Sequence, residues 1–186
     1  MKGRAPWKRT IEVIMLLVLL LLLGIGAFKL LYPLRYEDEI KAWTESYSLD
    51  LYLVAAVIRA ESRFDPYALS HAGAIGLMQI IPTTGEWIAT QIGEAGFTIA
   101  DLYDPGVNIR FGTWYLRYLF DRFGDTDVVL AAYNAGPSNA IRWQAGEGTI
   151  FPETERYIAR VKRGQIAYRT FYGLPWLGRL LRVTPR

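Results

Sequence analysis

The stretch AESRFDPYALSHAGAIGLMQIIP, residues 60–82, places an acidic side chain, Glu61, ahead of a run of small residues. The preceding sequence, SLDLYLVAAVIRAES, predicts a helix, because Asp50 can cap its start and apolar residues recur at helical spacing up to Glu61. The stretch itself predicts a loop, because Gly73 and Gly76 interrupt regular structure. Glycine also allows the backbone of such a loop to approach a ligand closely. The sequence therefore places a carboxylate where a helix ends and a ligand-binding loop begins.

The remaining sequence predicts a mainly α fold. It contains no internal repeat and no alternation long enough for a substantial sheet. Further helices are expected through Ile40, Trp43 and Tyr47, after Pro82, from about Val107 to Phe123, after a cap at Asp127, over 138–146 and over 152–172. Their expected buried positions include Ile109, Trp114, Leu116, Phe120, Tyr157, Val161, Ile166 and Tyr168.

Residues 11–34 form an apolar segment that predicts one transmembrane helix. No charged residue occurs from Val13 to Phe28. This run reaches roughly 24 Å as a helix, short of a hydrocarbon core of about 30 Å. Lys29 can extend its ammonium group outward, so that Leu30 and Leu31 complete the span.

The N-terminal flank predicts the orientation of this segment. Four basic residues precede it, which favours a cytoplasmic N-terminus and a domain on the extracytoplasmic side of the cell membrane: Lys2, Arg4, Lys8 and Arg9. The alternative is a cleaved signal peptide, in which Ile25-Gly26-Ala27 would pass for the small-residue cleavage site. The apolar run exceeds the usual signal core of about 7 to 15 residues, which favours a retained anchor. The chain has no Cys, which excludes a cysteine lipid anchor and disulfides.

The length of 186 residues suits one domain. The expected parts are a basic cytoplasmic N-terminus (1–10), the anchor (11–34), the domain (35–172) and a basic tail (173–186). All but one of the 18 acidic residues lie between Arg35 and Glu155. The basic, aromatic C-terminal sequence suits an anionic membrane or wall polymer. The alternative is a packed final helix with a disordered tail, and no nucleic-acid partner is expected outside the cytoplasm.

Several kinds of active site are not supported. His71 is the only histidine, and no nucleophile-elbow motif accompanies it. No cluster has the ligand spacing of a zinc site, and no glycine-rich loop precedes a Lys-Ser or Lys-Thr pair. We therefore expect neither a metal nor an organic cofactor.

Glu61 is the candidate general acid. The negative end of a helix dipole disfavours its charged form, and its apolar neighbours remove water, so both effects raise its pKa. A carboxyl that stays protonated can donate a proton to a leaving group. The alternative is a solvated helix-end residue that forms a salt bridge with Arg59 or Arg63.

Four separated motifs favour the catalytic interpretation. The pattern AxxxxESxFxPxAxSxxGAxGLMQIxP is followed by AAYNAGP and then by PETERYI. Together they resemble the lytic transglycosylases of the soluble-transglycosylase (SLT) catalytic-domain family, relatives of goose-type lysozyme, and the resemblance runs from about Ile40 to Tyr172. It implies a lysozyme-like helical fold with a groove for glycan strands.

The resemblance also implies an activity. Such enzymes are lyases that cleave the β-1,4 bond between N-acetylmuramic acid and N-acetylglucosamine in peptidoglycan. One glutamate, here Glu61, acts first as acid and then as base, and the C6 hydroxyl attacks to leave a 1,6-anhydromuramoyl end. Hydrolysis normally needs two carboxylates. We expect the nearest candidates to be turn or cap residues instead, namely Asp65, Asp101 and Asp104.

The same resemblance implies substrate-binding residues. We expect Ser70 and Gln79 to bind sugar hydroxyl or N-acetyl groups, and Met78 to line the groove. Tyr133 is expected to donate a hydrogen bond to Glu61 or to an N-acetyl oxygen. The remaining members, which hold the loop or close the groove, are Asn134, Glu153 and Tyr157.

Two alternatives to this activity stay open. One is a muramidase that hydrolyses the same bond with water. The other is a peptidoglycan-binding module without turnover, although a binding module has no need of a buried acid. The sequence identifies no protein partner.

Overall fold

The structure, a computed structural model, describes residues 6–174 of the chain. In this part the elements are α1 Pro6–Leu31, α2 Glu37–Ser46, α3 Leu51–Glu61, α4 Pro82–Ile92, the 3-10 helix η1 Ile99–Tyr103, α5 Pro105–Phe123, α6 Thr126–Ala135, α7 Pro137–Gln144 and α8 Pro152–Tyr172. The predicted mainly α class is confirmed. Residues 175–186, most of the predicted basic tail, lie outside the described residues.

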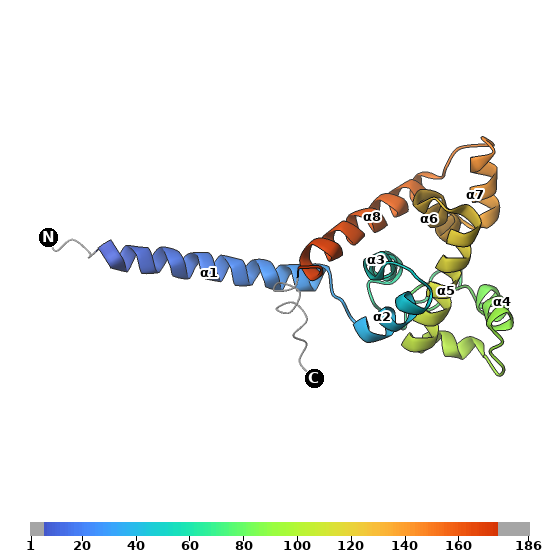
Figure 1. Ribbon diagram of the computed structural model, residues 1–186, viewed down its shortest axis with the longest axis horizontal. Helices are drawn as coiled ribbons and strands as arrows, with labels where there is room; N and C mark the ends of the chain where they lie inside the picture. Colours follow the sequence, from blue (N-terminus) through green and yellow to red (C-terminus); the bar gives the residue numbers. More distant parts are fainter. Residues whose placement is uncertain (1–5, 175–186) are drawn as a thin grey trace.

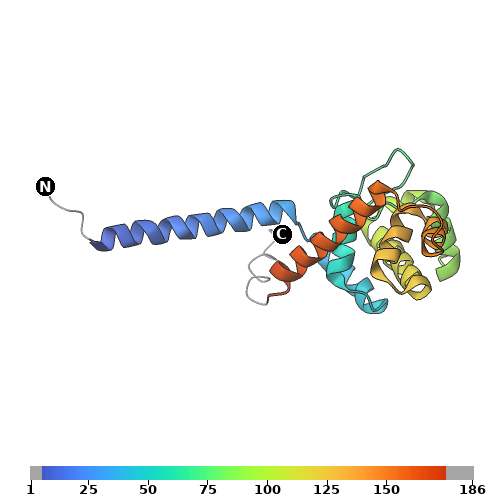
Figure 2. The ribbon, with the colours of Figure 1, turned by 90° about the horizontal axis from the view of Figure 1, so that it is seen from above.

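Helix α1 extends away from the other helices as a long rod (Figures 1 and 2). It is long and apolar enough to cross a membrane, and almost none of its apolar stretch is buried by the rest of the chain. It begins at Pro6, earlier than the predicted start at residue 11, and it ends ahead of Pro33. A helix in the core of a protein is covered by other residues, and α1 is not. Burial within this chain therefore does not explain why the surface of α1 is apolar.

Helix α3 lies among the other helices and packs most extensively on α8 (Figure 1). The first turn of α3 is capped as predicted, because the Asp50 carboxylate accepts a hydrogen bond from the Leu53 amide at 2.8 Å. The residues from Leu53 to Ile58 are all buried. Burial on every side makes α3 a rigid support for the glutamate at its C-terminal end.

The predicted cap of α6 is wrong. The Asp125 carboxylate, not Asp127, accepts hydrogen bonds from the first amides of the helix. Asp127 instead pairs with Lys162 of α8 at 2.8 Å. Asp125 and Asp127 lie only two positions apart. Asp127 pairs with α8, whereas Asp125 caps α6.

The predicted buried faces of α5 and α8 are partly wrong. Ile166 is 66% exposed, because α8 turns a face spaced by three and four residues toward α3. Its buried members are Thr154, Tyr157, Val161, Gly164, Tyr168 and Tyr172. In α5, Ile109 and Leu116 are buried as predicted, whereas Trp114 and Phe120 are only partly buried.

Between α3 and α4 the chain forms a compact loop over 62–81. Two isolated antiparallel bridges join Leu69 to Ile75 and Ile75 to Ile80. Ile75 and Ile80 are buried, so the loop is anchored in the core rather than lying free on the surface. This anchoring holds the loop next to the C-terminal end of α3.

Candidate active site

Glu61 is the last residue of α3 and is only partly exposed. Burial removes water from its carboxyl and raises its pKa from the ordinary 4.5 to about 7. The alternative of a salt bridge to a neighbour is not observed, since Arg59 donates its Nε proton to the Leu31 carbonyl and no ion pair joins Glu61 to Arg63 in the described chain. A carboxyl with this pKa is substantially protonated at neutral pH, as a general acid must be.

Two groups of α8 oppose this rise. The Tyr157 hydroxyl lies near the Glu61 carboxyl and lowers the pKa of that carboxyl, and the positive charge of Arg160 lowers it further. The Tyr157 hydroxyl is buried and meets full hydrogen-bond geometry with no described protein group, so its interaction with Glu61 is loose. Tyr157 is therefore placed beside the acid, and its predicted role in closing the groove stays a prediction.

Tyr133, on α6, does not donate to Glu61, which is one of the two acceptors expected for it; the other, an N-acetyl oxygen of the substrate, stays a prediction. Its hydroxyl donates a 2.8 Å hydrogen bond to the backbone carbonyl of Met78, and not to Glu61. Met78 itself is fully buried, and its side chain packs against Gly112 of α5. The Met78 side chain thus offers no surface to a sugar in this conformation, while its carbonyl fixes Tyr133 close to the acid.

The loop is tied to the end of α3 through Ser62. The Ser62 hydroxyl donates a hydrogen bond to the Leu77 carbonyl at 2.8 Å. Because Ser62 directly follows Glu61, this bond sets the distance between the acid and the loop. Ser62 belongs to the motif that carries the resemblance, although no contact had been assigned to it.

Asn108 is an important residue that the sequence did not indicate. It is fully buried on α5, and its side chain accepts a hydrogen bond from the Met78 amide at 2.7 Å. Its amide nitrogen donates to the Ile75 and Leu102 carbonyls at 3.0 and 2.8 Å. No local pattern marks it, because its partners lie far away in the sequence or in an irregular turn.

Gly76 explains why the loop can approach Asn108 so closely. Its φ is +77°, and a Cβ placed there would collide with the Asn108 side chain and the Leu102 carbonyl. Gly73, in the same loop, has a similar φ of +79° but open space around it. The two glycines therefore serve different needs, close packing at the first and backbone conformation alone at the second.

The predicted sugar-binding residues of the loop also support the loop itself. The Gln79 amide nitrogen donates to the Gly76 carbonyl at 2.9 Å and to the Ala68 carbonyl at 3.2 Å. The Ser70 hydroxyl accepts a hydrogen bond from the Ala74 amide at 2.9 Å. Both side chains keep further hydrogen-bonding capacity, so their contacts with sugars remain predictions.

The remaining predicted site residues lie where α6 meets α8. The Asn134 side chain accepts a hydrogen bond from the buried Thr154 hydroxyl at 2.9 Å, which joins the two helices. Glu153 is exposed in the first turn of α8. His71 is exposed in the loop. Neither Asn134 nor Glu153 is shown to contact Glu61, and their contacts with substrate also remain predictions.

The nearest candidate carboxylates in the sequence have local structural roles. Asp65 accepts a hydrogen bond from the Tyr67 amide, and Asp101 forms a capping box with Thr98. Asp104 caps α5 by accepting a hydrogen bond from the Val107 amide at 2.9 Å. Within residues 6–174, no group of His, Cys, Asp or Glu side chains is arranged to hold a metal ion.

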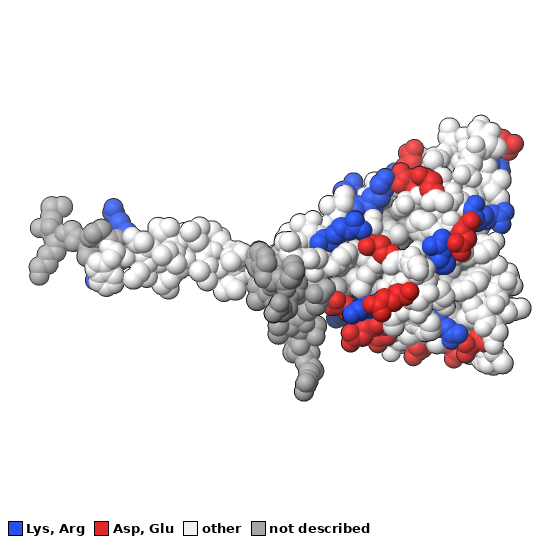
Figure 3. Space-filling model, viewed as in Figure 1, with Lys and Arg blue, Asp and Glu red and all other residues white. Residues whose placement is uncertain are grey.

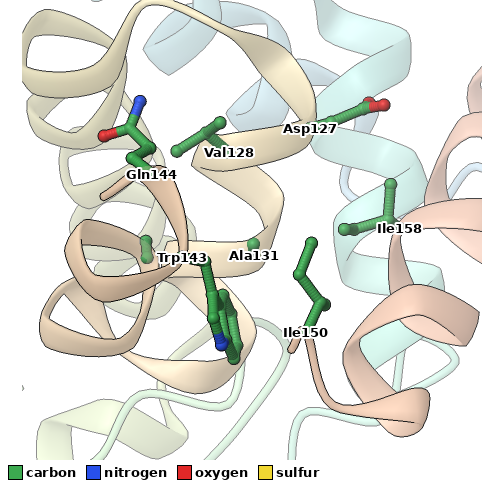
Figure 4. A pocket seen from close by; sticks show the side chains of 8 residues that line it. Asp127, Val128, Ala131, Trp143, Gln144, Ile150 and Ile158 are labelled. Carbon is green, nitrogen blue, oxygen red and sulfur yellow. The ribbon is translucent and has the colours of Figure 1, made fainter. Parts of the chain in front are cut away.

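Two of the hollows in the described chain are lined by residues of α4 to α8 and not by Glu61. One, of about 190 Å³, is mainly apolar and lies between α6, α7 and α8 (Figure 4). The other, of about 250 Å³, is lined by Thr83, Thr84, Trp87, Tyr115, Tyr118 and Pro137. Tyr115 also packs on Tyr133, with ring centroids 5.6 Å apart, so this aromatic hollow adjoins the residues around the acid.

The sequence matches known proteins over the same region. Residues 38–151 match the family model described as "Transglycosylase SLT domain". The soluble lytic murein transglycosylase of Escherichia coli K12 is 35% identical over 155 residues, which cover 76% of this chain and 24% of that protein. The membrane-bound lytic murein transglycosylase C of Glaesserella parasuis is 37% identical over 118 residues, covering 58% and 32%.

The fold agrees with solved structures as well. The 70 kDa soluble lytic transglycosylase of Escherichia coli superposes with a TM-score of 0.73 and 32% identity, over 78% of this chain and 26% of that one. An inactive mutant of lytic transglycosylase Slt from Pseudomonas aeruginosa gives 0.71 and 28%, over 77% and 25%. The chain thus spans about a quarter of the length of these solved relatives. From the family match over more than half of its length, the chain belongs to the transglycosylase SLT domain family.

Proposed function

We propose that this chain is a membrane-anchored peptidoglycan lytic transglycosylase with Glu61 as its single general acid and base. The observation that carries the proposal is a largely buried glutamate with a pKa of about 7, held between a rigid helix and a core-anchored loop. Relatives named as lytic murein transglycosylases align with this domain, which supports the substrate and the reaction. The inactive relative from Pseudomonas aeruginosa is a glutamate-to-glutamine mutant, which supports a glutamate as the essential group.

The reaction uses Glu61 twice. The protonated carboxyl donates its proton to the oxygen between N-acetylmuramic acid and N-acetylglucosamine, and the glycosidic bond breaks. The resulting carboxylate then accepts the proton of the muramoyl C6 hydroxyl as that oxygen bonds to the anomeric carbon. Glu61 ends protonated, no water is consumed, and the product carries a 1,6-anhydro ring. A second carboxylate is not required, in keeping with the local roles of Asp65, Asp101 and Asp104.

A cleavage assay tests Glu61. The full chain in uncharged detergent micelles is incubated with purified peptidoglycan sacculi, and the amount of soluble fragments released is measured over time. Glu61→Gln should release fragments at least about 100-fold more slowly, because general acid catalysis commonly contributes 10²–10⁴-fold. Glu147→Gln, which removes an exposed carboxylate far along the chain, should keep the full rate. Equal rates for both variants would reject Glu61 as the acid.

We further propose that α1 stays in the cell membrane with the domain on the extracytoplasmic side. The exposed apolar surface of α1 and the basic residues Lys8 and Arg9 at its start support this orientation. Fractionation of cells followed by intact mass measurement should find the full-length chain in carbonate-washed membranes. A shorter soluble chain that lacks α1 would instead indicate a cleaved signal.

A further inference from the structure

A cavity of about 490 Å³ lies where α1 meets the domain. Its lining comes from the end of α1 and the following turn, from the C-terminal end of α3 and the start of the loop after it, and from α8: Leu30, Leu31, Pro33, Arg59, Ala60, Arg63 and Arg160. Its volume falls within the range of about 300 to 1,000 Å³ that is usual for small-molecule sites. One lining residue, Arg160, also lowers the pKa of Glu61, but the proposed reaction gives the cavity itself no part in bond cleavage.

The charge of the lining is entirely positive. Three of its residues are arginines and none is acidic. In the described chain, neither Arg63 nor Arg160 makes an ion pair, and Arg160 instead lies over the Tyr157 ring at 5.5 Å. Guanidinium groups form strong, often bidentate hydrogen bonds with phosphate oxygens. The cavity is therefore suited to a group that carries a phosphate.

Arg59 is held in place before any ligand arrives. Its Nε donates a 2.7 Å hydrogen bond to the Leu31 carbonyl, and its guanidinium lies 4.1 Å from the centre of the Tyr32 ring. The remaining N–H groups of the guanidinium stay available to a ligand. A side chain fixed in this way loses little entropy on binding, which favours affinity.

The junction that forms the cavity is itself well packed. The rings of Phe28 and Phe171 stack with centroids 4.0 Å apart. The hydroxyls of Tyr168 and Tyr172 donate to the carbonyls of Pro33 and Tyr32 at 2.7 and 2.9 Å. These contacts join α1 to α8, so the cavity has fixed walls on both sides.

The apolar wall of the cavity continues along α1. Leu30 is 83% exposed and Leu31 is 59% exposed, so their side chains face outward at the end of the apolar helix. Figure 3 shows basic side chains along the part of α8 nearest this junction and acidic side chains over the region of α2. An anionic phospholipid carries a negatively charged phosphate next to apolar acyl chains. Positive charge beside an apolar surface is therefore complementary to such a lipid.

We propose that this cavity binds the phosphate of an anionic phospholipid headgroup, with the acyl chains lying along Leu30 and Leu31. The inference rests on the proposed membrane anchoring, because α1 in a bilayer brings the cavity to the surface of the outer leaflet. A bound headgroup fixes the domain against the membrane. Glu61, which directly follows Ala60 of the cavity wall, then acts on glycan strands close to the membrane surface.

Native mass spectrometry of the full chain tests the site. The protein in uncharged detergent micelles is mixed with phosphatidylglycerol, or with phosphatidylcholine as a lipid without net charge. The wild type should retain one phosphatidylglycerol and should prefer it over phosphatidylcholine. The double variant Arg63→Gln/Arg160→Gln should bind it at least about tenfold more weakly. Arg156→Gln/Arg163→Gln removes the same charge from exposed positions of α8 and should bind like the wild type.

Competition identifies the source of the anion. Inorganic phosphate at the same concentration should not displace the lipid, because it lacks acyl chains for Leu30 and Leu31. Displacement by phosphate, displacement by an acidic muropeptide, or equal lipid retention by both double variants would each overturn the proposal. Cleavage of sacculi by the same wild-type preparation is measured in parallel. Cleavage without lipid retention rejects the lipid site alone, whereas absence of cleavage rejects the proposed function independently.

Discussion

The Tyr133 hydroxyl donates its hydrogen bond to the Met78 carbonyl, 2.8 Å away, rather than to Glu61. The two tyrosines beside the acid therefore have separate roles. Tyr133 holds the loop, whereas the Tyr157 hydroxyl faces the carboxyl and lowers the pKa of Glu61. This division can be tested with a pair of substitutions that each remove one hydroxyl.

Tyr157→Phe should move the alkaline limb of the pH profile of kcat/KM upward. In the proposed reaction the limb reports the pKa of Glu61 in the free enzyme, about 7, because that reaction needs the protonated acid and is lost as pH rises through this value. The Tyr157 hydroxyl lowers the pKa of Glu61, so its removal should raise that pKa. Tyr133→Phe should leave the limb in place and cost about 1–2 kcal/mol of unfolding free energy, because the Met78 carbonyl loses its donor. A limb that moves only in Tyr133→Phe would reverse the two roles.

Arg160→Gln should shift the same limb upward, because the Arg160 charge also lowers the pKa of Glu61. Arg160 is exposed, so salt screens its charge. The difference between wild type and variant should therefore shrink as ionic strength rises, when rates are measured at several salt concentrations. A downward shift would mean that another charge dominates the field at Glu61.

Glu61→Gln should stabilise the fold at alkaline pH. The folded-state pKa of Glu61 is raised above the ordinary 4.5 to about 7, so the folded protein binds more protons than the unfolded chain between these values. The wild type consequently loses stability as pH rises from about 4.5 to 7, by roughly 3 kcal/mol at most. Gln cannot ionise and avoids this loss. Denaturant unfolding followed by tryptophan fluorescence should give the variant a higher free energy of unfolding than the wild type at pH 8. The difference should disappear near pH 4.5.

The matched control for that experiment is Glu147→Gln, at an exposed position. Its free energy of unfolding should change with pH in the same way as that of the wild type. A constant difference between Glu61→Gln and the wild type across the whole range would mean that Glu61 is not desolvated in the folded protein.

Gly76→Ala should be more damaging than Gly73→Ala. Both sites have a positive φ, which costs an alanine about 1–2 kcal/mol. Only at Gly76 would the added Cβ also collide with the Asn108 side chain and the Leu102 carbonyl. We expect a loss of at least about 3 kcal/mol for Gly76→Ala, read from denaturant unfolding. Equal losses at the two positions would indicate that close packing against Asn108 is unimportant.

Asn108→Asp should destabilise the loop strongly. An aspartate can still accept from the Met78 amide, but it cannot donate to the Ile75 and Leu102 carbonyls. Leaving buried polar groups unsatisfied costs about 1–3 kcal/mol each, so we expect a loss of about 3 kcal/mol or more. Asn139→Asp also removes a donor, to the Ala135 carbonyl at 2.8 Å, but at a partly exposed position in the first turn of α7 where a negative charge is favourable, so it should cost only about 1 kcal/mol. Similar effects for the two variants would contradict the structural role of Asn108.

Local signals explain which parts of the fold the sequence predicted well. Asp50 marks the start of α3 through a contact within one turn, and α3 begins where it predicts. Helix α4 begins at Pro82 itself, and α5 begins at Pro105, two residues ahead of the predicted Val107, because Asp104 caps it. The choice between Asp125 and Asp127 as a cap depends on Lys162, which is distant in the sequence. The exposure of Ile166 depends on how α8 is rotated against α3, which spacing within α8 alone does not determine.

The same distinction applies to the site. Glu61 and Tyr157 were predicted because motifs of the family contain them, and the structure places them together. Asn108 was missed because its partners, Ile75 and Met78, lie about thirty residues away and only folding brings them into contact. The arginine-lined cavity was missed for a similar reason, since α1, α3 and α8 each supply only part of its wall.

The most direct test of the central claim is the mass of the muramoyl ends released from purified sacculi by the full chain, with Glu61→Gln as control. Cleavage by Glu61 without water predicts ends that are lighter by one water than hydrolytic ends and that are absent from the control. Reducing ends would contradict the account, because they would require a hydrolytic reaction and a second catalytic group beside Glu61.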